Sequence, residues 1–439
     1  MAYAEKRPGG WTVRVKVGVD PDTGNDVYRR ISKDPTTGQL FATKTRARNF
    51  GNDQEAEIRA GTWIDPKKAE TTLADWWADW IKAQEVDTGT IAFYDSLWRN
   101  HLGPRWGATT LGEIRRGKFT EWLKGVGAGT IETGPADKRV TRKYAPRTIN
   151  GIGKLASLML EDAAEEQMIG RNPLAQEGRK RTRGRRATRR RTTIRVKLDV
   201  SPAEVMMIAV NMNELCGPVG FVRTVMAAWT GARPGEQAAL KRDQCHAMAA
   251  RPLIRIDDDE GTTQEYGGKV TLAPPKGGLG RDVLLPPSLA TLLTDWLKTH
   301  PADSTVVKGP HGDHWRRRQW NERWRPACDG KPELRRVGRQ FEPTGGWVIS
   351  PVVPRLEFKG LRRAHNVWMT DDGIAEVARA HRLGHAMSDE MQAAYSVVSR
   401  EMERKLLDAL ERRWQEALSP EAWEIISQIS PTLAKKRSS

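Results

Sequence analysis

The sequence has few cysteines and no long apolar run. Only three of its 439 residues are cysteines, Cys216, Cys245 and Cys328, and none is part of a CxxC pair. This excludes a disulfide framework and favours a reducing compartment. No apolar run approaches the roughly twenty residues that span a bilayer, and the first residues, MAYAEKRPGGW, lack the apolar core of a secretory signal. We therefore expect a cytoplasmic protein without a membrane partner.

Acidic residues are too few to balance the basic ones. The chain has 72 Lys and Arg against 55 Asp and Glu, a net charge of +17, so we expect a polyanionic partner. Eleven basic residues and no acidic one lie between Arg179 and Lys197, which leaves +6 for the remainder. This run is too polar to pack a core, so it is a linker or a strand that lies on the polyanion. Its candidate nucleic-acid ligands are Arg179, Lys180, Arg181, Arg183, Arg185, Arg186, Arg189, Arg190 and Arg191.

The length favours two or three domains, and residues 1–66 form the first candidate. Apolar and polar residues alternate over 11–17 and return at 27–31, with turn residues at 18–25 between them. The pattern becomes helical over 43–60. We expect a small three-stranded sheet plus a helix. Arg14, Lys16 and Arg29 lie on or near this sheet, either as a solvated face or as contacts to DNA.

Residues 71–175 have the pattern of a helical domain. Leu73, Trp76, Trp77 and Trp80 recur at i, i+3, i+4 and i+7, which predicts one buried helix face. A later helix from about residue 148 presents Ile152, Leu155, Leu158 and Met159 on one side. Such stripes usually belong to a core rather than to a ligand site.

Residues 200–419 mix helices with a small antiparallel sheet or hairpin and contain four short motifs. These are Thr230-Gly-Ala-Arg233-Pro-Gly-Glu236, a predicted hairpin over 270–285 with Lys276 at its tip, Lys359-Gly-Leu-Arg362 followed by His365, and Leu383-Gly-His385 with Tyr395 ten residues later. An arginine at a turn before a helix can bind a phosphate in bidentate fashion. The whole chain is therefore expected to be an α+β protein whose third domain is mainly α.

Each motif alone also has a purely structural interpretation. Arg233 could pair with Glu236, Lys276 could be an ordinary exposed loop lysine, and Tyr395 lies on an apolar stripe. His381 and His385 have zinc-ligand spacing, but no third ligand accompanies them, so we expect no metal site.

Taken together, the order and spacing of the four motifs resemble the tyrosine recombinase (phage integrase) family over about residues 220–410. Upstream, residues 71–175 resemble the core-binding domain of that family, and residues 1–66 resemble its arm-type DNA-binding domain. The resemblance makes residues 176–199 an interdomain linker and residues 200–419 the catalytic domain. Residues 420–439 would be a tail that packs either on a neighbouring protomer or on the same chain.

The resemblance implies a role for each motif residue. Tyr395 would be the nucleophile that holds the DNA 3′ end as a phosphotyrosine. Arg233 and Arg362 would bind the non-bridging phosphate oxygens, with His385 as the third member of this cradle. Lys276 would protonate the leaving 5′ oxygen.

Three further residues have supporting or alternative roles under the resemblance. Lys359 stands where relatives usually have histidine, and it is either a general base or only a phosphate ligand. Lys269 is the alternative for the hairpin lysine. Glu236 would orient the Arg233 turn, and His365 would be a supporting hydrogen-bond partner.

The resemblance implies a site-specific recombinase of a phage or mobile element, in the bacterial cytoplasm at the nucleoid. Such an enzyme would act as a homotetramer on double-stranded DNA with core-type and arm-type attachment sites, through a Holliday junction. It would need no metal, ATP or other cofactor. A directionality factor and a DNA-bending host protein are further partners that the resemblance suggests. The alternatives are a catalytically degenerate DNA-binding or architectural protein, and a DNA-relaxing enzyme of the type IB topoisomerase kind.

Overall fold

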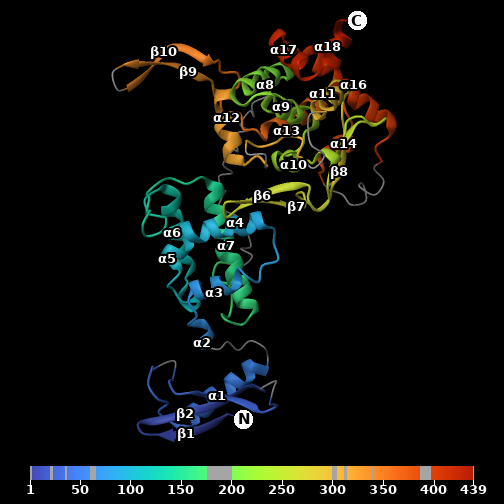
Figure 1. Cartoon of the computed structure of the whole chain (residues 1–439). Helices are drawn as coiled ribbons and strands as arrows, with labels where there is room; N and C mark the ends of the chain where they lie inside the picture. Colours follow the sequence, from blue (N-terminus) through green and yellow to red (C-terminus); the bar gives the residue numbers. More distant parts are fainter. Residues whose placement is uncertain are drawn as a thin grey trace, which may run out of the picture. The chain divides into compact units, whose positions relative to one another are not determined.

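The computed structural model describes residues 2–19, 23–34, 37–59, 66–175, 200–298, 304–310, 314–337, 340–385 and 397–438 (Figure 1). The chain divides into two compact units, residues 1–187 and 188–439. The basic run 179–191 and Tyr395 lie outside the described residues. Among the described helices, none is both long enough and apolar enough to cross a membrane.

The first unit begins with the predicted three-stranded sheet and helix. Strands β1 (Tyr3–Arg7), β2 (Gly10–Val19) and β3 (Asp26–Ile31) pair antiparallel in that order, and α1 (Lys44–Arg59) follows them. Val13 and Val15 of β2 are fully buried, as the alternation predicts, and form a small core with Phe41 and Ala47.

A separate hydrophobic cluster belongs to the helical part of the first unit. Its elements are α2 (Pro66–Ala69), α3 (Leu73–Trp80), α4 (Thr88–Leu97), α5 (Gly103–Trp106), α6 (Arg116–Ala128) and α7 (Pro146–Glu165). The predicted tryptophan stripe of α3 is buried, and the indole N–H of Trp80 donates to Asp162 of α7 at 2.6 Å. The prediction for α7 was wrong at Leu158, which is 39% exposed. The buried face runs through Ile152, Leu155, Ala156, Met159 and Leu160, and residue 158 lies about 100° away from residue 159.

The second unit surrounds a buried central helix, α9 (Pro218–Thr230). Around it lie α8 (Pro202–Cys216), α10 (Pro234–Ala239), α11 (Pro287–Leu297), α12 (Arg317–Asp329), α13 (Gly360–Asp371), α14 (Glu376–Leu383) and α16 (Arg400–Glu416). The Trp229 ring of α9 packs against the rings of Trp368 and Trp414, with centroids 5.3 and 5.1 Å apart. As the sequence predicts, α8 begins with a capping box at Ser201 and Glu204.

Two small antiparallel sheets of the second unit correct the predicted hairpin. Strands β4 (Cys245–His246), β5 (Leu253–Ile256) and β8 (Arg281–Leu284) form one sheet, and β6 (Thr262–Tyr266) with β7 (Lys269–Ala273) forms the other. Residues 270–285 are therefore not a hairpin, because β7 pairs with β6 and β8 pairs with β5. Gly267 and Gly268, with φ of 58° and 78°, form a two-residue turn that favours β6–β7 pairing. Lys276 lies in the connection between β7 and β8, after two prolines that cannot donate to a ladder.

Two other segments of the second unit form a hairpin and a pair of C-terminal helices. Residues 329–352 contain the antiparallel hairpin of β9 (Lys331–Val337) and β10 (Gln340–Ile349). At the C-terminus, α17 (Pro420–Ile429) and α18 (Pro431–Ser438) pack on their own unit, with Ile425 and Ile426 in its core.

Candidate functional site

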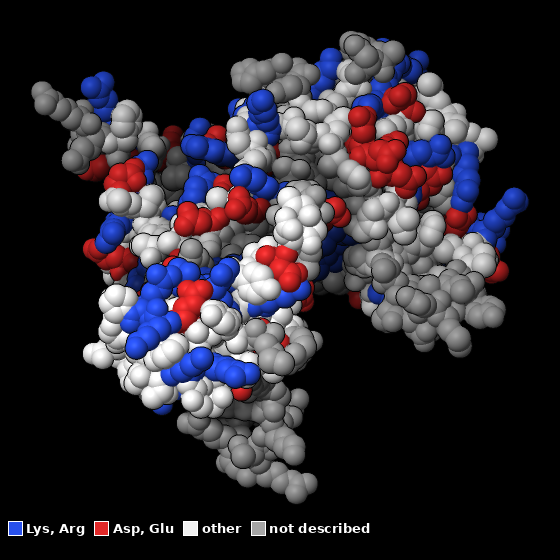
Figure 2. Space-filling model, turned by 90° about the horizontal axis from the view of Figure 1, so that it is seen from below, with Lys and Arg blue, Asp and Glu red and all other residues white. Residues whose placement is uncertain are grey.

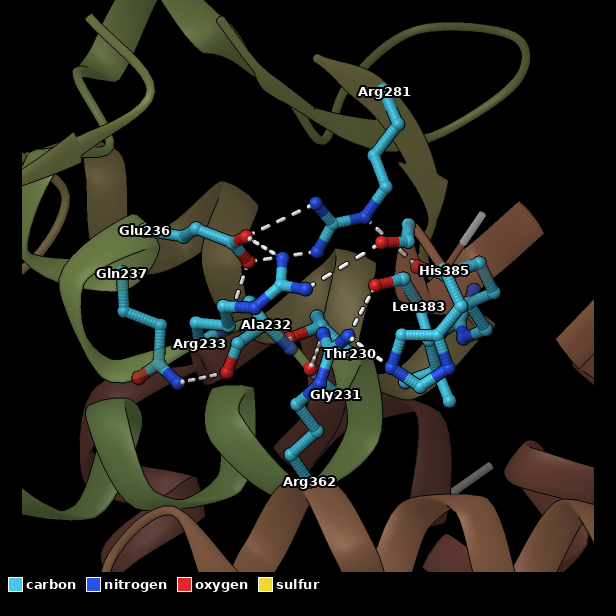
Figure 3. Close-up of polar contacts among 12 residues, drawn as sticks. Thr230, Gly231, Ala232, Arg233, Glu236, Gln237, Arg281, Arg362, Leu383 and His385 are labelled. Atoms are coloured by element: carbon cyan, nitrogen blue, oxygen red, sulfur yellow. Dashed lines mark hydrogen bonds and ion pairs between the residues drawn. The ribbon is translucent and has the colours of Figure 1, made fainter. Parts of the chain in front are cut away.

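The turn between α9 and α10 presents Arg233. It begins at Gly231, whose φ of 67° lies in the left-handed region, and a Cβ there would lie 2.6 Å from His365 Cδ2. Arg233 is the N-cap of α10. The carboxylate of Glu236 accepts from both the Arg233 backbone N–H and Nη1, each at 2.7 Å (Figure 3). The pairing considered as a structural alternative for Arg233 is thus present, yet 24% of the arginine side chain stays exposed.

Glu236 also binds a second arginine, Arg281 of β8. Arg281 Nη1 and Nη2 donate to the two carboxylate oxygens at 3.1 and 2.7 Å, and the two side chains are only 4% and 0% exposed. Burial disfavours the charged carboxylate, but hydrogen bonds and charge from Arg281, then Arg233, outweigh it, so the pKa of Glu236 lies below its ordinary value. The sequence analysis missed Arg281, since nothing in its spacing distinguishes it from a surface arginine at the start of a strand.

Arg362 of α13 lies beside Arg233. Its Nη1 donates to the carbonyl oxygen of Gly231 at 2.8 Å, and its Nη2 donates to the carbonyl oxygen of Leu383. Burial, followed by the charge of Arg233, lowers the pKa of Arg362 to about 10. The two guanidinium groups are therefore close enough to repel each other, and protein carbonyl groups help to hold them in place.

His385 follows directly after the end of α14. Gly384 turns the chain with a left-handed φ of 59°, and the exposed His385 ring lies beside Arg362, whose Nη2 is 3.1 Å from His385 Nε2. Burial and the charges of Arg362, Arg233 and Arg281 lower the pKa of His385. The ring is then neutral at pH 7, so that Nε2 accepts from Arg362 and the proton is on Nδ1.

His365 of α13 contacts Arg382 of α14, an arginine that belongs to none of the four sequence motifs. The imidazole is fully buried, and Arg382 Nε donates to its Nε2 at 2.9 Å. Burial and the Arg382 charge hold the pKa of His365 well below its ordinary range. The remaining Arg382 nitrogens donate to the carbonyl oxygens of Leu284 and Trp229, both at 2.8 Å. Arg382 thus connects β8, α9 and α13 to its own helix.

The three candidate lysines lie apart from these contacts. Lys359 precedes α13, is 64% exposed and pairs with Glu357 at 2.8 Å. Lys276 is exposed in the β7–β8 connection, and Lys269 is exposed at the start of β7. Among the described residues, no hydrogen bond or ion pair joins any of the three to Glu236, to His385 or to the carbonyl oxygens that bind the arginines. No group of His, Cys, Asp and Glu in the described part of the chain could hold a metal ion.

The candidate DNA ligands of the N-terminal sheet are partly paired with acidic residues. Lys16 forms an ion pair with Asp26, and Arg14 lies 3.7 Å from Glu5 with its guanidinium 5.3 Å from the Tyr28 ring centre. Arg29 is half-buried on β3. Figure 2 shows acidic side chains interspersed among the basic ones on the side of the molecule that it draws.

The comparisons with known proteins find integrases in sequence and in structure. No family model matches the chain. A curated protein of Mycobacterium tuberculosis, described as a candidate prophage phiRv2 integrase, is 24% identical over 272 residues. That match covers 60% of this chain and 62% of the relative, so the chain spans less than two thirds of the relative's length.

A solved integrase structure shares the fold, and a second one aligns less closely. A variant of the Tn1549 transposon integrase in complex with a circular intermediate DNA aligns with a TM-score of 0.50 and 12% identity, over 77% of this chain and 99% of that one. A lambda integrase tetramer bound to a Holliday junction aligns with a TM-score of 0.44 and 16% identity, over 90% and 94% of the two chains. In sequence the chain is therefore similar to a curated integrase, and in fold it is similar to the Tn1549 integrase, which agrees with the resemblance to tyrosine recombinases, or phage integrases.

Proposed function

We propose that this chain is a site-specific DNA recombinase that cleaves and rejoins DNA through a 3′-phosphotyrosine on Tyr395. The observation that carries the proposal is the excess of positive charge at the Arg233 turn. Three guanidinium groups, of Arg233, Arg281 and Arg362, gather around one carboxylate, that of Glu236, within the described part of the chain. Arg233 and His385 remain accessible to solvent there, so an anion such as a DNA phosphate can reach them.

The chemistry of phosphoryl transfer fits these groups. The Tyr395 oxygen would form a bond to phosphorus while the bond from phosphorus to the 5′ oxygen breaks. Charge that develops on the non-bridging oxygens would be stabilised by Arg233 and Arg362, with His385 as a further hydrogen-bond donor. The leaving 5′ oxygen would take its proton from an exposed lysine, either Lys276 or Lys269. Lys359 stays a candidate for the base or for a phosphate ligand.

The partners in this proposal are DNA and further copies of the chain. The Tn1549 integrase, which shares the fold, is bound to DNA in its structure. Four copies would exchange strands through a Holliday junction, in a bacterial cytoplasm. The basic run 179–191 would contact the backbone and add affinity more than sequence selectivity. Arg14, Lys16 and Arg29 would meet an arm-type site, and a directionality factor and a DNA-bending host protein would assist.

A covalent-trapping experiment tests the proposal. Duplexes that the full chain selects from a random DNA pool are resynthesised with single nicks at successive positions. Where a nick lies just 3′ to a cleavage site, the short strand that carries the free 5′ hydroxyl diffuses away, so the adduct cannot be rejoined. The wild-type chain should form an adduct that survives denaturation, whereas Tyr395→Phe should form none. Tyr266→Phe, which removes a phenolic hydroxyl at the exposed end of strand β6, is the matched control and should behave as wild type.

The other outcomes separate the alternatives. Tight DNA binding without any adduct would contradict the proposal and indicate a DNA-binding protein without catalysis. An adduct that also appears with Tyr395→Phe would refute the nucleophile. Relaxation of supercoiled plasmid without exchange between two duplexes would indicate a topoisomerase instead.

A further inference from the structure

The end of helix α14 receives an arginine at each of three consecutive carbonyl groups. Arg281 Nε donates to the carbonyl oxygen of Arg382 at 3.0 Å, Arg362 Nη2 to that of Leu383, and Arg233 Nη2 to that of Gly384 at 3.5 Å (Figure 3). The last carbonyls of a helix have no partner within the helix and carry the negative end of its dipole, so cations bind well there. The three arginines come from β8, α13 and the turn before α10, which therefore meet at one helix end.

Arg281 differs from the other two arginines because it is almost fully enclosed. Its side chain is 4% exposed, and all three of its guanidinium nitrogens donate to protein groups, namely the Arg382 carbonyl and both oxygens of Glu236. This leaves it little capacity to bind a phosphate. Its contacts instead join two parts of the site, since Glu236 holds the Arg233 turn and the α14 end carries His385.

We propose that Arg281 is a positioning residue of the strand-cleavage reaction, which fixes Arg233 through Glu236 and His385 through the end of α14. The inference rests on the proposed function above. Arg281 also packs directly against the residue before His385, because a Cβ on Gly384 would lie 3.0 Å from Arg281 Nη1. Loss of Arg281 would free both the Glu236 carboxylate and the α14 end. Displacement of a reacting group by about 1 Å can lower a rate on the order of 100-fold.

The test compares Arg281→Met and Arg281→Lys with a matched control, Arg255→Met. Arg255 lies on the neighbouring strand β5, where it pairs with Asp282, but its side chain is 55% exposed. The rate of adduct formation on nicked DNA is measured at saturating DNA, together with the affinity for that DNA. We expect Arg281→Met to cleave about 100-fold more slowly with an affinity within about threefold of wild type. Arg281→Lys keeps the charge but cannot bond to both partners, so its rate should be intermediate, and Arg255→Met should match wild type.

A pH profile separates positioning from general destabilisation. Burial and the charges of Arg362, Arg233 and Arg281 depress the pKa of His385, so removal of the Arg281 charge should move the acidic limb of the cleavage rate to higher pH. Arg281→Lys and Arg255→Met should leave that limb in place. The profile is measured only over the pH range in which both proteins stay folded, so that a loss of stability alone does not move this limb.

Each other result overturns the inference. A folded Arg281→Met that cleaves within threefold of wild type, or that loses no more than Arg255→Met, refutes the positioning role. If Arg281→Met does not fold, Arg281→Lys decides, and a full wild-type rate for that variant refutes the role. Absence of an adduct from the wild-type chain is a distinct result, because it refutes the proposed function itself and the inference with it.

Discussion

Replacement of Glu236 by alanine should destabilise the second unit by about 3–5 kcal/mol, the range for breaking a buried ion pair on one side. The Glu236 carboxylate is fully buried and accepts from the Arg233 backbone N–H, from Arg233 Nη1 and from both Arg281 Nη groups. Without it, Arg281, which is 4% exposed, keeps a charge that water cannot reach. The loss is therefore mainly the free energy of an uncompensated buried charge.

Glu260→Ala is the control for this prediction. Glu260 pairs with Lys241 at 2.6 Å, but the two side chains are 51% and 38% exposed, so its removal should cost about 0–1 kcal/mol. The assay is the urea dependence of hydrogen exchange in peptides from α9 of the full chain, which reports on the unfolding of this unit alone. A difference between the two variants below about 1 kcal/mol would refute the reasoning about buried charge.

The difference in stability between the wild type and Glu236→Ala should also depend on pH. Burial raises the pKa of Glu236, but the two arginines lower it by more than burial raises it. The pKa in the folded state therefore lies below the ordinary value. The carboxylate then contributes its full stability above the ordinary glutamate pKa of about 4.3, and loses it as the pH falls through the folded value. The stability difference from wild type should be constant between about pH 5 and 8 and should shrink below about 4.3. A difference that grows on acidification would show that the carboxyl is not ionised in the fold.

Two further predictions concern the end of α14. Gly384→Ala should lose about 1–2 kcal/mol of unfolding free energy because of its left-handed φ of 59°, and more because the new Cβ would contact Arg281. Gly278→Ala, at φ 71° in open space, should lose only the backbone contribution. Urea unfolding measures both variants. His385 should titrate below the ordinary histidine pKa of about 6.5 in NMR spectra of labelled protein, and Arg362→Met should raise its midpoint. Because its folded pKa is depressed, neutral His385 contributes stability above about pH 6.5 that is lost on acidification, and an unshifted midpoint would contradict the Arg362–His385 contact.

Much of the fold follows from periodicity that each segment carries within itself. The alternation over 11–17 predicts a strand with one buried face, and β2 buries Val13 and Val15. The tryptophan stripe of α3 predicts a helix face in the core, and that face is buried. Helix α8 begins at the capping box of Ser201, as the sequence predicts. These signals act over a few residues, so they survive without knowledge of the tertiary structure.

The pairing of strands was predicted less well, because it depends on competition between distant segments. Residues 270–285 read as one hairpin because Gly277 and Gly278 could close a turn. The segment 262–266, joined to β7 by Gly267 and Gly268, offers β7 a nearer partner, and β8 then pairs with β5, 25 residues earlier at Ile256 and Arg281. No local pattern in 270–285 contains this information.

The motif residues of the candidate site could be chosen from their spacing, but the residues that hold them could not. Arg281 and Arg382 lie in an ordinary strand and an ordinary helix, and arginines in such places are usually exposed. They become recognisable only when the fold brings Glu236 within 2.7 Å of Arg281, 45 residues away, and His365 within 2.9 Å of Arg382. A buried arginine leaves no sequence pattern, since its side-chain partners lie far along the chain and its other partners are carbonyl groups, which every residue has.

The arrangement also explains how like charges can be kept together before any anion binds. Two of the guanidinium groups, of Arg233 and Arg281, share the Glu236 carboxylate, and the third, of Arg362, relies on the carbonyl oxygens of Gly231 and Leu383. Carbonyl groups supply partial negative charge without neutralising the cluster, so its net charge stays positive. A second carboxylate would hold the arginines more strongly but would compete with the DNA phosphate that we propose as the ligand. An anion-binding site needs this arrangement. Backbone dipoles hold the arginines in place, and no further acidic side chain cancels their charge.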